Sequence, residues 1–314
     1  MSFVVYLVGG RPKPVEEALA GKGIEVLTGD GEFNGEMLAR CHVMMPGRGY
    51  ITKEILDRAP NLKLIVKTGV GTDRIDVAEC AKRGIRVENT PYSNFISVAE
   101  HTVALMLAVA KQLNPIGLNF RRESAKQFDP GKYPSIELFG KNLALIGLGN
   151  IGLRVAKIAS GFDMNIIGYA RRPNRSATPR YISLADSMGG AVSNADFVSL
   201  HVSGVEENRG LIGAGELSLM KRTAVLINTT RGFVVDEKAL YDALVNKRIA
   251  GAGLDVFEDE PLKPGNPLLR LENVVATPHS ASNTPEARSR AFSSCAQIIL
   301  DYAAAVKGGV HSGR

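Results

Sequence analysis

The stretch Leu143-Ala-Leu-Ile-Gly-Leu-Gly-Asn-Ile-Gly152 decides the fold of this chain, because it joins a short apolar run to a glycine-rich turn. The run predicts a buried strand, and Gly147-x-Gly149-x-x-Gly152 with a helical pattern behind it predicts a turn that opens a helix. The first glycine allows the tight turn, the second lets the backbone approach a phosphate, and the third lets helix pack on strand. Together with Asn150 and Ile151 inside the turn, this stretch predicts the binding site of a dinucleotide pyrophosphate.

Composition places the chain among ordinary water-soluble proteins. It has 314 residues, 45% of them hydrophobic and 22% charged, with a net charge of +6, and the length suggests about two domains. There is no apolar run of the roughly 18–20 residues that a membrane span needs, and the first residues predict a strand instead of a signal peptide. Cys41, Cys80 and Cys295 have no metal-ligand spacing, which predicts reduced thiols in a cytoplasmic protein without a metal site. No nucleic-acid-reading module appears.

Short β runs alternate with helical stretches along the whole chain, which predicts an α/β fold with parallel sheets covered on both faces. In the first hundred residues the predicted strands are 3–8, 24–27, 42–45, 62–67 and 85–88, and the predicted helices are 15–20, 52–58 and 77–82. A second series has six strands at 143–146, 165–169, 197–201, 224–228, 252–256 and 274–276, and a helix over 285–305 follows. Between the series, the helix 98–113 is apolar on all sides, which predicts burial in a core or against a second subunit. The polar residues 121–137 predict a connecting loop.

Three ionisable residues follow the later strands of the second series: Arg231, Glu260 and His279. In open parallel sheets, ligands bind outside the carboxyl ends of the strands, so we expect these side chains to meet beside the dinucleotide. Arginine presents a planar fork to a carboxylate, histidine transfers a proton near neutral pH, and a carboxylate orients the histidine. The trio predicts reversible reduction of a 2-keto acid.

The chain resembles the D-isomer-specific 2-hydroxyacid dehydrogenases. The resemblance covers nearly the whole chain. It is carried by Thr68-Gly-Val-Gly-Thr-Asp73, Asn89-Thr-Pro91, Val98-Ala-Glu-His-Thr102, Glu137-Leu-x-Gly-Lys141, the glycine turn, Arg231-Gly232, Gly253-Leu-Asp-Val-Phe257, Glu260-Pro261 and Pro278-His279. It implies two doubly wound domains: a substrate domain of residues 1–97 and 285–314, and a dinucleotide-binding domain of residues 98–284 inserted into it. The helix from Val98 would then be both the contact of a homodimer and the interdomain hinge.

The same resemblance implies a role for each matching residue. Arg231 would bind the substrate carboxylate and carbonyl, Glu260 would tune the histidine, and His279 would be the acid/base. Asp255 would hold the nicotinamide carboxamide. Further cofactor contacts are expected at Thr102, His201, Thr229 and His279, and substrate contacts at Val70, Gly71 and Asn94.

The chain departs from the family where a cofactor ribose would lie. About 20 residues past the glycines an NAD enzyme usually carries an acid, whereas this chain has Ala170, Arg171 and Arg172. Because arginines bind a 2′-phosphate that an acid would repel, the sequence predicts NADP(H) as the preferred cofactor, with NAD(H) possible. Arg74 stands where Asn is usual, Ser203 where Pro is common, and the chain has no Trp.

The sequence therefore predicts an NADP(H)-preferring reductase of a small anionic 2-keto acid such as glyoxylate or hydroxypyruvate. An NAD-linked 3-phosphoglycerate dehydrogenase is the alternative enzyme, and formate dehydrogenase is disfavoured because Ser280 follows the histidine. A corepressor of the same fold, which binds proteins in response to a dinucleotide, is the alternative outside enzymes.

Overall fold

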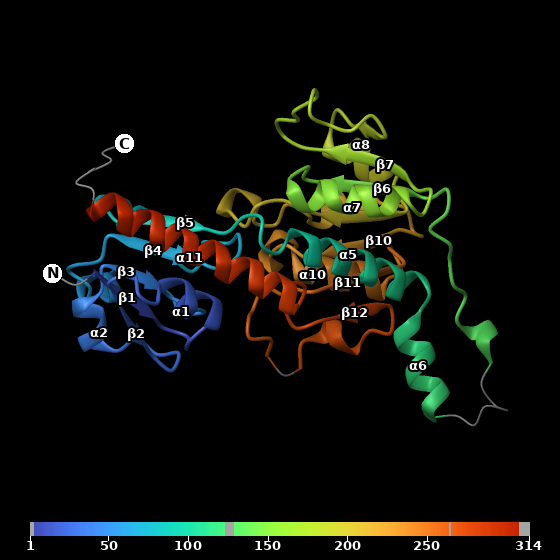
Figure 1. Ribbon diagram of the computed structural model, residues 1–314. Coiled ribbons are helices and arrows are strands. Elements are labelled where there is room, and N and C mark those ends of the chain that lie inside the picture. The colour runs from blue at the N-terminus through green and yellow to red at the C-terminus, as the bar shows by residue number, and fades with distance from the viewer. Residues whose placement is uncertain (1–2, 123–128, 264, 308–314) are drawn as a thin grey trace. The chain divides into compact units, whose positions relative to one another are not determined.

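The computed structural model describes residues 3–122, 129–263 and 265–307, and its chain forms two compact units. The first unit contains residues 1–94 and 283–314, and the second contains residues 95–282 (Figure 1). The second unit is thus a single insertion into the first. The inserted unit was predicted to span residues 98–284, whereas here it spans residues 95–282. Its start lies earlier because the apolar helix begins at Phe95.

The first unit is built on a five-stranded parallel sheet in the order β2-β1-β3-β4-β5. Its strands are β1 Phe3–Leu7, β2 Ile24–Thr28, β3 Val43–Met45, β4 Leu64–Lys67 and β5 Arg86–Asn89. Its helices are α1 Lys13–Leu19, α2 Gly35–Arg40, α3 Lys53–Asp57, α4 Val77–Lys82 and α11 Pro285–Lys307. Alternate residues of β1 point to opposite faces, as the pleat requires. Val5 and Leu7 pack with α1 and α11, and Tyr6 packs with α2, α3 and α4.

The second unit is built on a seven-stranded parallel sheet in the order β12-β11-β10-β9-β6-β7-β8. Its strands are β6 Asn142–Ile146, β7 Asn165–Tyr169, β8 Ile182–Leu184, β9 Phe197–Leu200, β10 Val225–Asn228, β11 Gly251–Leu254 and β12 Val274–Ala276. Its helices are α5 Phe95–Ala110, α6 Leu113–Arg122, α7 Asn150–Ser160, α8 Met188–Ser193, α9 Ala214–Leu219 and α10 Glu237–Val245. Short 3-10 turns η1 Pro130–Lys132, η2 Glu206–Asn208, η3 Gly232–Val234 and η4 Pro267–Arg270 interrupt the loops.

Both faces of this second sheet are covered, as continuous apolar strands require. Leu143 and Leu145 of β6 face a core made with α5 and α7, whereas Ala144 and Ile146 face a core made with α8, α9 and α10. The strand order reverses between β6 and β9. The crevice at the carboxyl ends of these two strands is where a doubly wound sheet binds its ligand.

The structure corrects the expected elements in three places. The sheet has a seventh strand, β8, where six were expected, and the first unit has an additional helix, α2. The apolar helix ends at Ala110 instead of Leu113, and a separate helix, α6, follows it. Residues 123–128 of the expected loop 121–137 lie outside the described residues.

Helix α5 is largely covered by its own unit. Of the two kinds of burial that its composition predicts, in a core or against a second subunit, the structure shows burial in the core. It packs on α7, β10, β11 and β12, and only Glu100 and Ala104 are exposed along its length. Exposed apolar side chains lie instead on α6, at Leu113, Leu118 and Phe120. Within the described residues no single helix is long and apolar enough to span a membrane; the bent pair α5 and α6 reaches that length and apolar content only when taken together.

Candidate active site

The glycine turn lies at the reversal point of the second sheet, between β6 and α7. Gly147 has φ +106°, and a Cβ there would lie 2.4 Å from the carbonyl oxygen of His201. A Cβ on Gly152 would lie 2.3 Å from the carbonyl oxygen of Gly147. At both positions only glycine fits without moving backbone.

The middle glycine of the turn faces open space. A Cβ on Gly149 would meet no atom within 4 Å, and no side chain caps the N–H groups at the start of α7. Asn150 and Ile151 open that helix, and neither is buried. Uncapped N–H groups beside an uncovered backbone fit the pyrophosphate of a dinucleotide.

His201 follows β9 on the other side of the reversal point. Its Nε2 lies 2.9 Å from the Ser199 hydroxyl, and its Nδ1 is buried without a partner. Burial lowers the pKa of His201 to about 3, so the ring is uncharged at neutral pH. A Cβ on Gly152 would lie 3.3 Å from the Cβ of His201, so His201 lies beside the turn, where its uncharged ring adds no positive charge.

The two arginines expected at the ribose end of the site differ in their surroundings. Ala170, Arg171 and Arg172 follow β7 directly. Arg171 Nη2 donates to the Glu207 carbonyl at 3.1 Å and to Asn208 Oδ1 at 2.6 Å. Arg172 is exposed, and the structure gives it no hydrogen bond or ion pair within the described part of the chain.

Arg231, Glu260 and His279 meet at the carboxyl ends of β10, β11 and β12. His279 Nδ1 lies 2.6 Å from Glu260 Oε2, and Glu260 Oε1 accepts the Phe257 N–H at 3.3 Å. Burial raises the pKa of Glu260, but the hydrogen bond and charge of His279, the Phe257 N–H and the Arg231 charge together bring it below its usual value. Glu260 is therefore ionised at neutral pH and lies close to His279 and Arg231.

Gly232 explains how the loops that carry Arg231 and Glu260 come together. A Cβ on Gly232 would lie 1.8 Å from the carbonyl carbon of Phe257 and 2.2 Å from the nitrogen of Glu258. The two backbones therefore touch at a point where no side chain fits. The sequence motif Arg231-Gly232 places Arg231 directly before the residue that permits this contact.

Asp255 holds the backbone of the loop that ends in His279. Its carboxylate accepts the Thr277 hydroxyl at 2.6 Å and the N–H groups of Ser280 and Ala281 at 2.8 and 2.9 Å. The His279 N–H donates to the Asp255 carbonyl at 2.7 Å, which fixes the left-handed backbone of His279 at φ +50°. Burial raises the pKa of Asp255, but these donors and His101 lower it to a net value below the usual one.

Two of the residues expected to contact the cofactor are buried in this structure. Asp255 is 1% exposed and Thr102 has no exposed surface, and their contacts with a cofactor stay predictions. Thr102 Oγ1 lies 3.0 Å from the hydroxyl of Thr229, which is itself buried. His101 lies within the Val98–Thr102 motif, but the sequence analysis assigned it no role; its Nε2 lies 2.9 Å from Thr277 Oγ1. No motif signalled this contact, because its partner is 176 residues away.

The predicted substrate loop belongs to the first unit. Asn89 Nδ2 donates to the Val70 carbonyl at 2.7 Å, and the Gly69 N–H donates to the Thr90 hydroxyl at 2.7 Å. A Cβ on Gly69 would lie 3.7 Å from Asn94 Nδ2, so Asn94 lies beside the loop that leads to Val70 and Gly71. Asn94 Oδ1 is buried without a partner.

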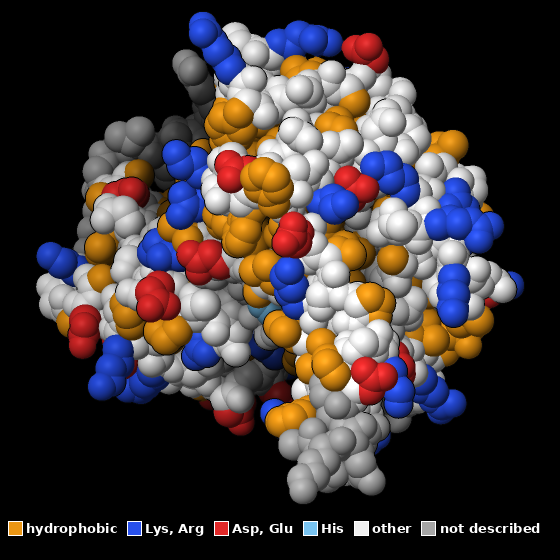
Figure 2. Space-filling model, turned by 90° about the vertical axis from the view of Figure 1, so that its right-hand side faces the viewer, with side chains coloured by type: hydrophobic (Ala, Val, Ile, Leu, Met, Phe, Trp, Pro, Cys, Tyr) orange, Lys and Arg blue, Asp and Glu red, His pale blue; other side chains and the backbone are white. Residues whose placement is uncertain are grey.

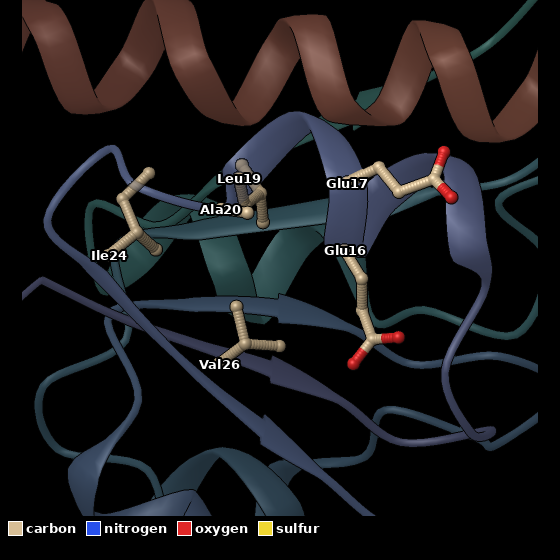
Figure 3. A pocket seen from close by; sticks show the side chains of 6 residues that line it. All are labelled: Glu16, Glu17, Leu19, Ala20, Ile24 and Val26. Carbon is tan, nitrogen blue, oxygen red and sulfur yellow. The ribbon is translucent and has the colours of Figure 1, made fainter.

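Two further features do not contribute to this site. A depression on the first unit is lined by the side chains of α1 and β2 shown in Figure 3, and it includes none of the residues above. Among the described residues, no three His, Cys, Asp or Glu side chains gather as a metal-binding group.

Known proteins resemble this chain in sequence and in fold. Residues 103–281 match the family described as D-isomer specific 2-hydroxyacid dehydrogenase, NAD binding domain. The chain belongs to this family. Similar proteins include D-3-phosphoglycerate dehydrogenases and glyoxylate reductases, and solved structures share the fold.

The relatives carry two different names. A D-3-phosphoglycerate dehydrogenase of Methanocaldococcus jannaschii is 42% identical over 250 residues, which cover 79% of this chain and 47% of that protein. A glyoxylate reductase of Korarchaeum cryptofilum is 42% identical over 257 residues, which cover 80% of this chain and 76% of that protein. The chain thus spans about half the length of the phosphoglycerate dehydrogenase that it matches.

One of the solved structures has a cofactor in place. It is the NADPH-dependent glyoxylate/hydroxypyruvate reductase of Sinorhizobium meliloti in complex with NADP and malonate. It is 29% identical, with a TM-score of 0.83, and the match covers 97% of this chain and 93% of that one. The parallel-sheet architecture of both units is therefore that of the family.

Proposed function

We propose that this protein is an NADP(H)-preferring D-2-hydroxyacid dehydrogenase that reduces small 2-keto acids such as glyoxylate or hydroxypyruvate. The observation that carries the proposal is the 2.6 Å contact between His279 and the ionised Glu260, with the charge of Arg231 close enough to lower the pKa of that carboxyl. The trio lies at the same edge of the sheet as the glycine turn. Acid, base orienter and carboxylate anchor are the groups that keto-acid reduction requires.

Each residue of the trio has one task in this reaction. Arg231 binds the substrate carboxylate with its planar fork and holds the keto group next to His279. The reduced nicotinamide, when bound, supplies the hydride to the keto carbon. His279 donates its proton to the keto oxygen, so the product is the 2-hydroxy acid and the histidine becomes neutral. Glu260 holds the ring by Nδ1, which leaves Nε2 to carry the transferred proton.

The chain of the second unit supplies the cofactor site. Gly147, Gly149 and Gly152 with the N-terminus of α7 would hold the pyrophosphate. Ala170 removes the acid that selects NAD, and the exposed Arg172 is available to a 2′-phosphate. Buried Thr102, Thr229 and Asp255 would shape the nicotinamide end from behind. Val70, Gly71 and Asn94 of the first unit would contact the substrate.

Turnover tests the activity and the cofactor choice together. The purified protein is assayed with glyoxylate, hydroxypyruvate and 3-phosphohydroxypyruvate, each with NADPH and NADH. We expect kcat/KM for NADPH to exceed that for NADH by about tenfold, the effect of one charge-assisted hydrogen bond at an exposed site. Equal values would show that Arg172 is only a solvated surface charge. No turnover of any keto acid would refute the activity.

An NAD-dependent 3-phosphoglycerate dehydrogenase remains the second candidate. The observation in its favour is the 42% identity to the Methanocaldococcus jannaschii protein of that name. The same assay separates the two: a preference for the phosphorylated substrate with NADH would establish the second candidate instead.

We also propose that the protein forms a homodimer through α6. Leu113, Leu118 and Phe120 are 55%, 49% and 52% exposed on this amphipathic helix, and Phe139 is 69% exposed after it. Figure 2 looks onto the side where α6 lies, and hydrophobic side chains gather there. An exposed apolar group of this kind is typical of an interface, and two-fold dimers are the commonest assembly.

Light scattering at micromolar concentration tests the assembly. Leu118→Glu is expected to shift the mass from dimer to monomer, because it places a charge in the proposed contact. Leu219→Glu is the matched control, since Leu219 is 50% exposed on α9 of the same unit. A monomeric parent protein would refute the proposal.

A further inference from the structure

The loop after β9, residues 201–208, contacts both ends of the proposed site. At one end it receives Arg171, whose Nη2 donates to the Glu207 carbonyl at 3.1 Å and to Asn208 Oδ1 at 2.6 Å. Asn208 is 5% exposed, and its Nδ2 donates to the Ser203 carbonyl at 2.8 Å. The guanidinium therefore anchors a buried amide that closes the loop upon itself.

At its other end the loop touches Arg231. A Cβ on Gly204 would lie 2.7 Å from Arg231 Cγ and 3.3 Å from Arg231 Nε. Because Cγ is close to the backbone, the arginine cannot avoid such a side chain by moving only its tip. The stem of Arg231 therefore lies directly on the backbone of Gly204, the residue next to the carbonyl that Asn208 holds.

We propose that Arg171 and Asn208 are positioning residues for Arg231, and that Gly204 is the surface on which the Arg231 side chain is placed. This inference rests on the proposed function, since it takes Arg231 as the group that binds the substrate carboxylate. It divides the work of the two arginines after β7. Arg172 meets the 2′-phosphate, whereas Arg171 holds the loop that supports the substrate end.

Charge and geometry support this division. A bond from a guanidinium to an amide oxygen at 2.6 Å is charge-assisted and short, and such bonds are the strong ones. Nη2 of Arg171 already serves two acceptors, so full engagement of this nitrogen with a phosphate would release the loop. Arg172 has no such contact to lose within the described residues.

The test compares four substitutions with both cofactors. Arg171→Ala and Asn208→Ala are expected to raise KM for the keto acid by about tenfold with NADPH and with NADH alike. Gly204→Ala should do the same, with cofactor affinity unchanged, because its methyl group displaces the Arg231 stem. Arg172→Ala should weaken NADPH more than NADH. Arg175→Ala is the neutral control, because Arg175 is exposed and its ion pair with Asp186 is long, at 3.9 Å, and also exposed.

A binding measurement gives a readout apart from turnover. Calorimetry with malonate, a non-reacting dicarboxylate, measures the carboxylate site of the protein with and without dinucleotide. We expect Arg171→Ala to weaken malonate binding about tenfold and Arg171→Lys to restore part of it, because the lysine ammonium can donate to either acceptor although its side chain is one atom shorter. Unchanged melting temperatures show that the variants are folded. If the alanine variant does not fold, the lysine variant still tests the proposal.

The outcomes separate the two proposals. A parent protein that binds malonate but reduces no keto acid refutes the proposed function and leaves the loop open to the calorimetric test. A parent protein that is active, with an Arg171→Ala variant that loses only NADPH affinity, refutes the loop inference alone. So does a Gly204→Ala variant with an unchanged keto-acid KM and unchanged malonate affinity.

Discussion

Replacing Glu260 with glutamine probes the contact that carries the proposed chemistry. The carboxylate lies 2.6 Å from His279 Nδ1, and its side chain is 23% exposed, so glutamine removes a charge while keeping an acceptor of the same size. Reduction needs the protonated ring. Because the carboxylate stabilises that form, its loss should move the fall of reduction activity with rising pH toward lower pH. Oxidation of the 2-hydroxy acid needs the neutral ring, so it should persist to lower pH.

The size of the shift follows from the type of hydrogen bond. A bond to a charged group contributes about 1.5–3 kcal/mol and a neutral one about 0.5–1.5, so the substitution removes about 1 kcal/mol. At 1.36 kcal/mol per pH unit, the midpoint should move by roughly 0.7 unit. The exposure of His279, 42% of its side chain, screens the pair and keeps the shift small.

The assay is kcat/KM for glyoxylate reduction between pH 5 and 9 at saturating NADPH, roughly the range in which histidine titrates. Glu258→Gln is the control, because Glu258 neighbours the same loop but pairs with Arg209 at 3.5 Å and not with the histidine. A midpoint that stays in place in the Glu260 variant, or moves to higher pH, would refute the assigned role of the carboxylate.

Three further predictions concern the same loops. His279→Ala should lower kcat by roughly 10²–10⁴-fold, while NADPH should still bind, as seen by a change in the fluorescence of NADPH itself. Full activity of the variant would remove the histidine from the mechanism. Gly232→Ala should destabilise the fold by more than about 4 kcal/mol in denaturant titrations, because its Cβ meets Phe257 backbone at 1.8 Å, whereas Gly215→Ala, in open space on α9, should be neutral or stabilising. Asp255 has a lowered pKa in the folded protein, so its stabilisation is present above its unfolded-state pKa of about 3.9 and is lost as the pH falls from there through the lower folded-state pKa. Melting curves of Asp255→Asn should show lower stability at neutral pH and a weaker dependence on acid, and parallel curves for the two proteins would contradict this.

Much of the fold could be predicted from local pattern, and the misses have local reasons. The apolar residues on every side of the 98–113 stretch correctly indicated burial, and α5 is the result. Helix α6 was missed because Pro115 and Gly117 discourage a helix. Pro115 is the third residue of α6, where the N–H has no helical acceptor in any case, so proline costs little there. Strand β8 is three residues long, which is too short for an alternation of apolar and polar residues to be recognised.

Only those residues of the candidate site that belong to a recognisable sequence motif could be predicted. The glycine turn and the positions of Arg231, Glu260 and His279 follow from strand ends. The contact between Arg171 and Asn208 does not, since it joins residues 37 positions apart through a loop of undefined geometry. The burial of Asp255 was also hidden, because two of its hydrogen-bond donors are backbone N–H groups that carry no sequence signal.

The insertion of residues 95–282 as one uninterrupted segment has a genetic consequence. The proposed dinucleotide site and all three residues of the proton and carboxylate machinery are encoded by one continuous stretch of the gene, whereas Val70, Gly71 and Asn94 lie upstream of it. A single recombination event with two breakpoints, near Asn94 and Ser282, would exchange the cofactor specificity and the acid–base chemistry together. The proposed substrate loop would be inherited unchanged. The proposed cofactor site and the proposed substrate loop can therefore be inherited separately.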